Sequence, residues 1–262
     1  MFISISRRLS AGFVNLPAVL TLGVALATPS FAATLLNGSF ENVGSATSSF
    51  SINFPTVLSN WTATPTGNKV LNCLVMPTDT TRLCGTPNGW TLQFWNNGVG
   101  GNFPGGPSPD GGNFVAIDGD VNYATPMTQA LTGLVVGRLY TVEFYQAAAQ
   151  QFGFDGATTE RWQVSLGSET KLSTLMITAN HGYVGWMKES LTFTAQTAND
   201  VLRFLALGTP NGLPPFVLID GISFNEAINT PEPSSFALIG GGGLVLLWIK
   251  RRARRKTGTK PE

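Results

Sequence analysis

The chain is poor in the residues that most enzyme active sites and metal centres use. Its 262 residues include one histidine and two cysteines, and only 12% are charged. The histidine, His181, lies in the turn-like stretch Asn180 to Tyr183, and no G-x-S-x-G motif supplies a serine partner for it. We therefore expect a surface histidine and no His-based catalytic site, which disfavours most classes of hydrolase.

Clustered basic residues are missing from the middle of the chain. Residues 33–230 contain 7 basic and 13 acidic residues, a net charge of −6, although the whole chain carries +1. Binding to phosphate backbones requires grouped Lys and Arg, so nucleic acid is not an expected partner. A glycosidase needs only two carboxylates about 5–10 Å apart, but no such pair can be singled out among the acidic residues. The chain is predicted not to be an enzyme, with a carbohydrate-active enzyme kept as an alternative.

The two cysteines, Cys73 and Cys84, would close a short loop that contains Pro77. An even number of cysteines in an exported chain predicts one disulfide. The alternatives are two unpaired buried thiols or a metal site, and no further Cys or His lies nearby to support the latter.

Residues 1–32 have the pattern of a secretory signal peptide. Arg7 and Arg8 precede an apolar stretch from Leu16 to Ala27, and small residues at Ser30 and Ala32 offer a cleavage site before Ala33. The two arginines also partly resemble a twin-arginine signal. We favour the general secretory route, because the domain has a predicted disulfide and no cofactor motif.

The C-terminal end has the three parts that a membrane anchor needs. Pro231, Glu232 and Pro233 separate it from the domain, and an apolar run extends from Phe236 to Ile249. A basic block follows, consisting of Lys250, Arg251, Arg252, Arg254, Arg255 and Lys256, which favours the cytoplasmic side. The run of 14 residues would span about 21 Å of a hydrocarbon core roughly 30 Å thick, so the transmembrane helix is short.

This order of Pro-Glu-Pro, short apolar helix and Arg-rich end resembles the PEP-CTERM sorting signal. The resemblance covers residues 231–256, followed by a polar end at 257–262, and it concerns localisation alone. It implies processing by an exosortase, a transpeptidase-like membrane enzyme of Gram-negative bacteria, and an association with exopolysaccharide. The expected course is an inner-membrane intermediate and then the cell surface or extracellular matrix. An ordinary tail anchor is the alternative.

Residues 33–230 have the pattern of one β-rich domain. Apolar residues alternate with polar ones in several short segments, for example at Tyr140, Val142 and Phe144. Clusters of Gly, Pro, Asn and Asp separate these segments, and no stretch sustains a helical period. We predict an all-β fold, an antiparallel jelly-roll β-sandwich of about eight to ten strands, with Gly98 to Gly112 as one long exposed loop.

A second resemblance rests on segments at the start, middle and end of this domain. The first segment is Leu36 to Glu41 and the last is Leu218 to Phe224. The middle of the domain contributes Asp110 to Gly119, Gln129 to Leu131 and Gly137 to Tyr140. Together they resemble galactose-binding-like jelly rolls, which include carbohydrate-binding modules. The resemblance implies a structural calcium ion where the first and last strands meet, with Glu41 and Asp220 as the matching carboxylates. In an unbulged strand Asp220 would also share an apolar face with Leu218, Ile222 and Phe224, where a carboxylate must be paired or bound to metal. Ca²⁺ prefers such oxygen ligands. The alternative is that Asp220 caps a turn before Gly221.

Two tryptophans are candidates for gripping a sugar ring. Trp90 and Trp95 differ by an odd number of positions, so in one strand they point to opposite faces. One of them is then expected to point away from the core, where an indole flanked by Asn and Gln can stack on a sugar. The alternative is that both pack into the core or a loop, as we expect for Trp61, Trp162 and Trp186.

These observations predict a non-enzymatic surface or matrix protein whose domain binds polysaccharide or another envelope component. The main alternative is a purely structural surface protein without a small ligand. The sequence does not separate a binder from a spacer.

Replacing Glu232 with Ala tests whether the Pro-Glu-Pro motif is a sorting signal. Membrane insertion should be unchanged, because the apolar run and the basic block that drive it are intact. Processing should fail, so the variant should accumulate as a full-length membrane species on immunoblots. Equal processing of both proteins in a host with the sorting enzyme would mean that the motif is only a linker.

Overall fold

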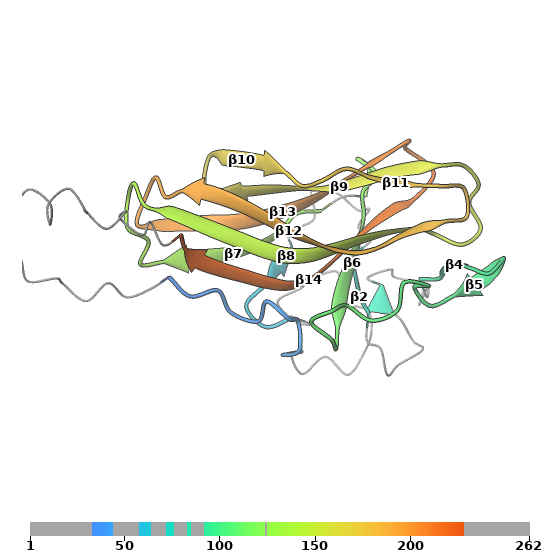
Figure 1. Ribbon diagram of the computed structural model, residues 1–262, viewed down its shortest axis with the longest axis horizontal. Coiled ribbons are helices and arrows are strands. Elements are labelled where there is room, and N and C mark those ends of the chain that lie inside the picture. Colours follow the sequence, from blue (N-terminus) through green and yellow to red (C-terminus); the bar gives the residue numbers. More distant parts are fainter. Residues whose placement is uncertain are drawn as a thin grey trace, which may run out of the picture. The chain divides into compact units, whose positions relative to one another are not determined.

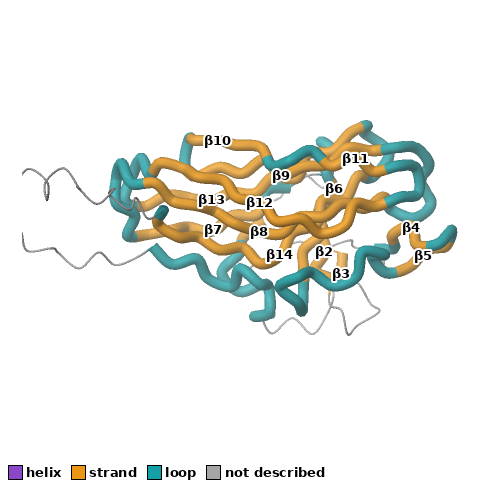
Figure 2. Tube along the Cα trace, in the orientation of Figure 1, coloured by secondary structure: helices purple, strands orange, loops and turns teal. Residues whose placement is uncertain are grey.

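A computed structural model describes residues 33–43, 58–63, 72–75, 83–84, 92–123 and 125–227, with the backbone alone at 72–75 and 83–84. The predicted signal peptide, Trp90 and the predicted sorting signal at 231–256 lie outside the described residues. Within those ranges the secondary structure is β throughout, as Figure 2 shows. No helix in this part of the chain is long and apolar enough to cross a membrane.

Fourteen strands are described, more than the eight to ten expected from the sequence. The excess comes from short strands within connections, such as those at residues 94–101 and 169–178. The strands are β1 (Thr62–Ala63), β2 (Asn72–Val75), β3 (Leu83–Cys84), β4 (Phe94–Asn96), β5 (Val99–Gly101), β6 (Phe114–Asp118), β7 (Met127–Thr132), β8 (Leu139–Gln150), β9 (Thr158–Leu166), β10 (Glu169–Leu172), β11 (Met176–Thr178), β12 (Tyr183–Thr194), β13 (Asn199–Thr209) and β14 (Pro215–Glu226).

The strands form two six-stranded antiparallel sheets and one small hairpin. The first sheet has the order β1-β7-β13-β9-β10, with β11 also paired to β9, and the second has the order β12-β8-β14-β6-β2-β3. The long strands of both sheets are labelled in Figure 1. From β6 to β9, successive strands alternate between the second and the first sheet, and β12, β13 and β14 continue this alternation. The antiparallel all-β architecture expected from the sequence is therefore confirmed.

The main core lies between the two sheets and follows from period-two alternation. On β8, Tyr140, Val142 and Phe144 are buried while their neighbours are half exposed. On β13, Leu202 and Phe204 face the same core and contact residues from the opposite sheet. Trp61 and Trp162 are fully buried in this core, as expected. Burying one face of each sheet in this way supplies the main driving force for folding.

A second, smaller core covers the opposite face of the β8–β14–β6 region. Ala147, Leu218 and Ala116 on these strands pack against Leu92, Phe94 and Phe103 from the segment 92–113. Phe103 is 6% exposed and makes edge contacts with Phe94, Phe114 and Trp186. The prediction that Gly98 to Gly112 is one long exposed loop is therefore wrong. Its glycines and prolines allow tight turns, and Phe103 holds the segment against the sheet.

The backbone brings the two cysteine positions together. Cys73 on β2 and Cys84 on β3 are directly opposite in an antiparallel pair. Opposed residues in such pairs have Cα atoms about 4.5–5.5 Å apart, within the roughly 4.4–6.8 Å range that a disulfide bridges. The strand register is thus compatible with the predicted disulfide.

A buried carboxylate in the first sheet gives the fold a dependence on pH. Glu160 on β9 is fully buried, and its Oε2 accepts a hydrogen bond of 2.7 Å from the Thr178 hydroxyl. Its Oε1 has no partner among the described residues. Burial raises the pKa of Glu160 to about 7, because the charged form is poorly solvated there.

We expect Glu160→Gln to flatten the dependence of stability on pH. The folded protein holds the Glu160 proton up to about pH 7, whereas the unfolded chain releases it near 4.5. This group therefore favours folding most below pH 4.5, and that contribution is lost as the pH rises through 7. Between pH 5 and pH 8, the parent should lose roughly 2–3 kcal/mol more unfolding free energy than the variant. Denaturant titrations at both pH values measure this difference, and parallel curves would contradict it.

Candidate functional site

An irregularity in β14 determines where Asp220 points. The pairing of β14 with β8 shifts between Asp220 and Ser223, and Gly221 at this shift has a φ of 58°. Asp220 is opposite Tyr145 and lies on the same face as Leu218. Ile222 and Phe224, beyond the shift, contribute to the main core instead. The expectation of an unbulged strand with Asp220 beside Ile222 and Phe224 is thus wrong, although Asp220 is indeed on a buried apolar face.

Asp220 is the centre of an acidic cluster formed by three separate parts of the chain. Its Oδ1 accepts a hydrogen bond of 2.7 Å from the Gly221 N–H. Burial raises the pKa of Asp220 to about 7; the nearby Ser108 hydroxyl and the Gly221 N–H oppose this, and the charges of Asp110 and Glu41 add to it. The structure thus brings Glu41 and Asp220 into one neighbourhood, together with Asp110, which the sequence analysis did not assign as a ligand.

Backbone contacts fix the position of Glu41 in this cluster. The carbonyl of Gly38 accepts a hydrogen bond of 3.0 Å from the Ile222 N–H. A Cβ atom at Gly38 would lie 1.9 Å from the Ile222 carbonyl oxygen, so only glycine allows this approach. Three residues later, Oε1 of Glu41 accepts a hydrogen bond of 2.5 Å from the Asn113 N–H. The segment from Gly38 to Glu41 is therefore attached both to β14 and to the start of β6.

The acidic cluster has one feature that suits a bound cation. The Asp220 Oδ2 atom is buried and has no hydrogen-bond partner in the described part of the chain, and an unpaired buried carboxylate oxygen is costly. No three Asp, Glu, His or Cys side chains among the described residues are close enough to ligate one metal ion. A cation here would therefore need backbone carbonyls or water as further ligands, which Ca²⁺ readily accepts.

Trp95 makes internal contacts that occupy much of its ring. The indole stacks on the His181 ring with centroids 3.7 Å apart, contacts Phe152, and donates its N–H to the Phe154 carbonyl at 2.8 Å. His181 lies at a left-handed turn position with φ 59° and also interacts with Asp155, so it is the surface histidine expected. His181 covers one face of the Trp95 indole, so that face is closed to a sugar ring.

The outer face of the first sheet carries two neighbouring cavities. On β13, the residues that alternate with the buried Leu202 and Phe204 are Val201, Arg203 and Leu205. Pairing places Arg203 opposite Thr128 of β7 on one side and opposite Ser165 of β9 on the other. The outward residues of β7, β13 and β9 thus form one continuous surface.

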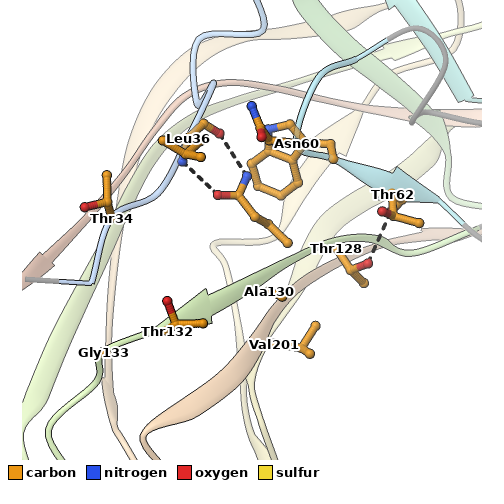
Figure 3. A pocket seen from close by; sticks show the side chains of 11 residues that line it. Thr34, Leu36, Asn60, Thr62, Thr128, Ala130, Thr132, Gly133 and Val201 are labelled. Carbon is orange, nitrogen blue, oxygen red and sulfur yellow. Dashed lines mark hydrogen bonds between the residues drawn. The ribbon is translucent and has the colours of Figure 1, made fainter.

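The first cavity, of about 710 Å³, lies over β1 and β7, and six of its eleven lining residues have a hydroxyl or amide side chain. Thr34, Thr62, Thr128 and Thr132 lie around it in Figure 3. The Thr128 hydroxyl donates to the Thr62 carbonyl at 3.2 Å. No residue with a charged side chain lines the cavity among those described.

Gln129 holds one wall of this cavity in place. The side-chain oxygen of Gln129 accepts a hydrogen bond of 2.7 Å from the Leu36 N–H, and its NH₂ group donates one of 2.8 Å to the Leu36 carbonyl. The amide thus pairs with the backbone of Leu36 as a neighbouring strand would. These bonds attach the N-terminal segment to β7 and form one wall of the cavity.

The second cavity, of about 620 Å³, lies over β13 and β9. Leu205, Leu207 and Leu175 give it an apolar surface, and Arg161 and Arg203 give it a positive charge. Both volumes fall in the range of about 300–1,000 Å³ that is usual for ligand pockets. Sequence analysis missed this pair of arginines, because only the pairing of β9 with β13 brings Arg161 and Arg203 to the same cavity.

No family model matches the chain, and no curated protein matches it either. Among solved structures, it is similar to TmCBM61, a carbohydrate-binding module in complex with β-1,4-galactotriose, at 15% identity and a TM-score of 0.42 over 74% of this chain and 99% of that chain. It is also similar to a CBM4 structure, at 14% identity and a TM-score of 0.34, over 73% of this chain and 98% of that chain. A third similar structure is a putative sugar binding protein from Bacteroides thetaiotaomicron, at 10% identity and a TM-score of 0.35, over 74% of this chain and 100% of that chain. Because all three TM-scores lie below 0.5, these similarities carry no argument about what this chain binds.

Proposed function

We propose that the domain is a non-catalytic module that binds polysaccharide on the outer face of the first sheet. The observation that carries this proposal is the pair of adjacent cavities on one continuous surface of β1, β7, β13 and β9. A polymer needs an extended surface with several shallow sites, whereas a small metabolite needs one enclosed pocket. The hydroxyl and amide groups of the first cavity can exchange hydrogen bonds with sugar hydroxyls.

The chemistry of the surface also fits a sugar. Sugar rings have apolar faces and polar edges, and the two cavities combine aliphatic side chains with Thr and Asn groups. Among the described residues that line the two cavities there is no Asp, Glu, His, Cys or Lys that could act as an acid or base or activate a Thr hydroxyl. The alternative is a purely structural surface protein. Such a protein would bind no glycan.

The location of this module follows from the two ends of the sequence. A signal peptide at residues 1–32 would export the chain, and the PEP-CTERM-like segment at 231–256 would pass it to an exosortase at the inner membrane. The module would then be exposed at the surface or in the matrix of a Gram-negative bacterium. An exopolysaccharide would be its natural ligand there.

We further propose that a calcium ion binds beside Asp220 and Glu41, with Asp110 adding negative charge. The support is the unpaired buried Oδ2 of Asp220 and the negative charges of Glu41 and Asp110, which are near enough to raise the pKa of Asp220. Bound calcium would neutralise this charge and hold the N-terminal segment, β14 and the segment before β6 together. Its role would be structural, because the acidic cluster includes no residue that lines either cavity.

Filling the first cavity should abolish binding to polysaccharide there. Ala130 is exposed and lines the cavity, so Ala130→Trp would occupy it without disturbing the core. We expect the full chain, purified in mild detergent, to be retarded by a retained polysaccharide in affinity electrophoresis and the variant to lose at least about tenfold in affinity. Val136→Trp, at an exposed position outside the cavities, is the matched control. Retention by no glycan in a broad panel would favour the structural alternative.

Calcium should raise the melting temperature through Asp220. At about a hundredfold excess over Kd, one bound ion adds about 2.7 kcal/mol, which corresponds to a shift of several degrees for a domain of this size. Asp220→Asn and the milder Glu41→Gln should both remove or reduce the shift measured between calcium and EDTA. Glu160→Gln, which alters a buried carboxylate outside the acidic cluster, should keep it. Equal shifts in all four proteins would place any calcium elsewhere.

A further inference from the structure

The two arginines of the second cavity differ from the other basic residues of the described chain. Arg138 pairs with Glu226, Lys171 with Glu169, and Lys188 with Glu143. Arg161 and Arg203 have no carboxylate or other hydrogen-bond partner among the described residues, and both line the same cavity. In a domain with a net charge of −6, the unpaired positive charge of the described sheets is thus gathered at one place.

The surroundings of these arginines favour an anion that is attached to an apolar ring. Leu205 and Leu207 are half-buried beside Arg161 and Arg203, and Leu175 and Val121 lie exposed at the cavity. A guanidinium group forms paired, charge-assisted hydrogen bonds with carboxylate and sulfate oxygens. The aliphatic side chains would meanwhile contact the apolar face of the sugar that carries the acid group.

The spacing of the arginines favours a polymer over a single small anion. Arg161 is opposite Leu207, which is four residues from Arg203 along β13. With about 3.3 Å per residue along the strand and about 4.8 Å between strands, the two Cα atoms are roughly 14 Å apart. Each guanidinium can therefore meet its own acidic group on one chain.

The two cavities lie next to each other at Arg203. This residue is directly opposite Thr128, and the Thr128 side chain lines the first cavity. A polymer that occupies the neutral, hydroxyl-lined cavity would therefore extend past Arg203 into the cationic one. The first cavity would hold neutral parts of the ligand, and the second would detect its charge.

We infer that the ligand is an acidic polysaccharide, with carboxylate or sulfate groups that Arg161 and Arg203 recognise in the second cavity. This inference rests on the proposed function and adds the chemical class of the glycan. The arginines determine specificity, because the first cavity alone does not distinguish charged from neutral sugars.

Matched polymers that differ only in charge test this inference with the full chain. The probes are polygalacturonate against its methyl ester, and dextran sulfate against dextran, so that carboxylate and sulfate are separated. We expect the parent to bind at least one charged polymer about tenfold or more tightly than its neutral counterpart at low salt, with the preference reduced at high salt. Arg161→Gln/Arg203→Gln should lose this preference and keep the affinity for the neutral polymer.

The control variant is Arg138→Gln/Lys188→Gln, which removes the same charge from paired positions outside the cavity and should keep the preference. Equal binding of charged and neutral polymers by the parent would overturn the inference and leave the proposed function intact. Binding of neither, with no other glycan retained, would remove the proposed function itself. Equal retention of single-stranded nucleic acid would also overturn it, because the cavity would then respond to charge alone.

Discussion

Burial of β14 on both faces is the constraint on which the rest of this domain depends. Val217 and Ile219 face the core between the sheets, while Phe216 and Leu218 face the second core beneath residues 92–113. A strand in this position cannot shift by one residue without exchanging its two apolar faces. Its register therefore positions β8 and β6 on either side. The break after Asp220 keeps this carboxylate on the face of the second core, which also holds the buried Asp118 of β6, opposite Phe216.

The segment 92–113 changes how the two sheets can be used. It covers part of the outer face of the second sheet through Leu92, Phe94 and Phe103, and Trp186 extends this cover by donating to the Gly106 carbonyl at 3.1 Å. The corresponding face of the first sheet retains half-exposed aliphatic and threonine side chains and the two cavities of about 710 and 620 Å³. The asymmetry between the faces thus results from one Gly-rich connection, and it leaves the first sheet as the broader platform for a ligand.

Sequence reasoning succeeded where local pattern decides the structure. Alternation at Tyr140, Val142 and Phe144 predicted a half-buried strand, because every second side chain must leave water. It failed where one distant contact decides, as at Phe103, whose burial cannot be inferred from the glycines and prolines around it. Asp220 was predicted on an apolar face. Which of the two apolar faces of β14 it lies on depends on the register shift at Gly221, and this shift arises from tertiary contacts that the sequence pattern does not reveal. Arg161 and Arg203 are 42 positions apart in the sequence, and only the register of β9 and β13 brings them to one surface.

The attachment of the first described residues bears on the order of events in the proposed export. Ala33 is 8% exposed and belongs to the core between the sheets, and three residues later the backbone of Leu36 is bound on both sides by Gln129. A peptidase requires an extended, accessible backbone around the bond that it cuts. Cleavage before Ala33 would thus have to precede closure of the domain, since folding shields this residue. A chain that crosses the membrane unfolded meets this condition, whereas a chain translocated after folding would present a protected bond.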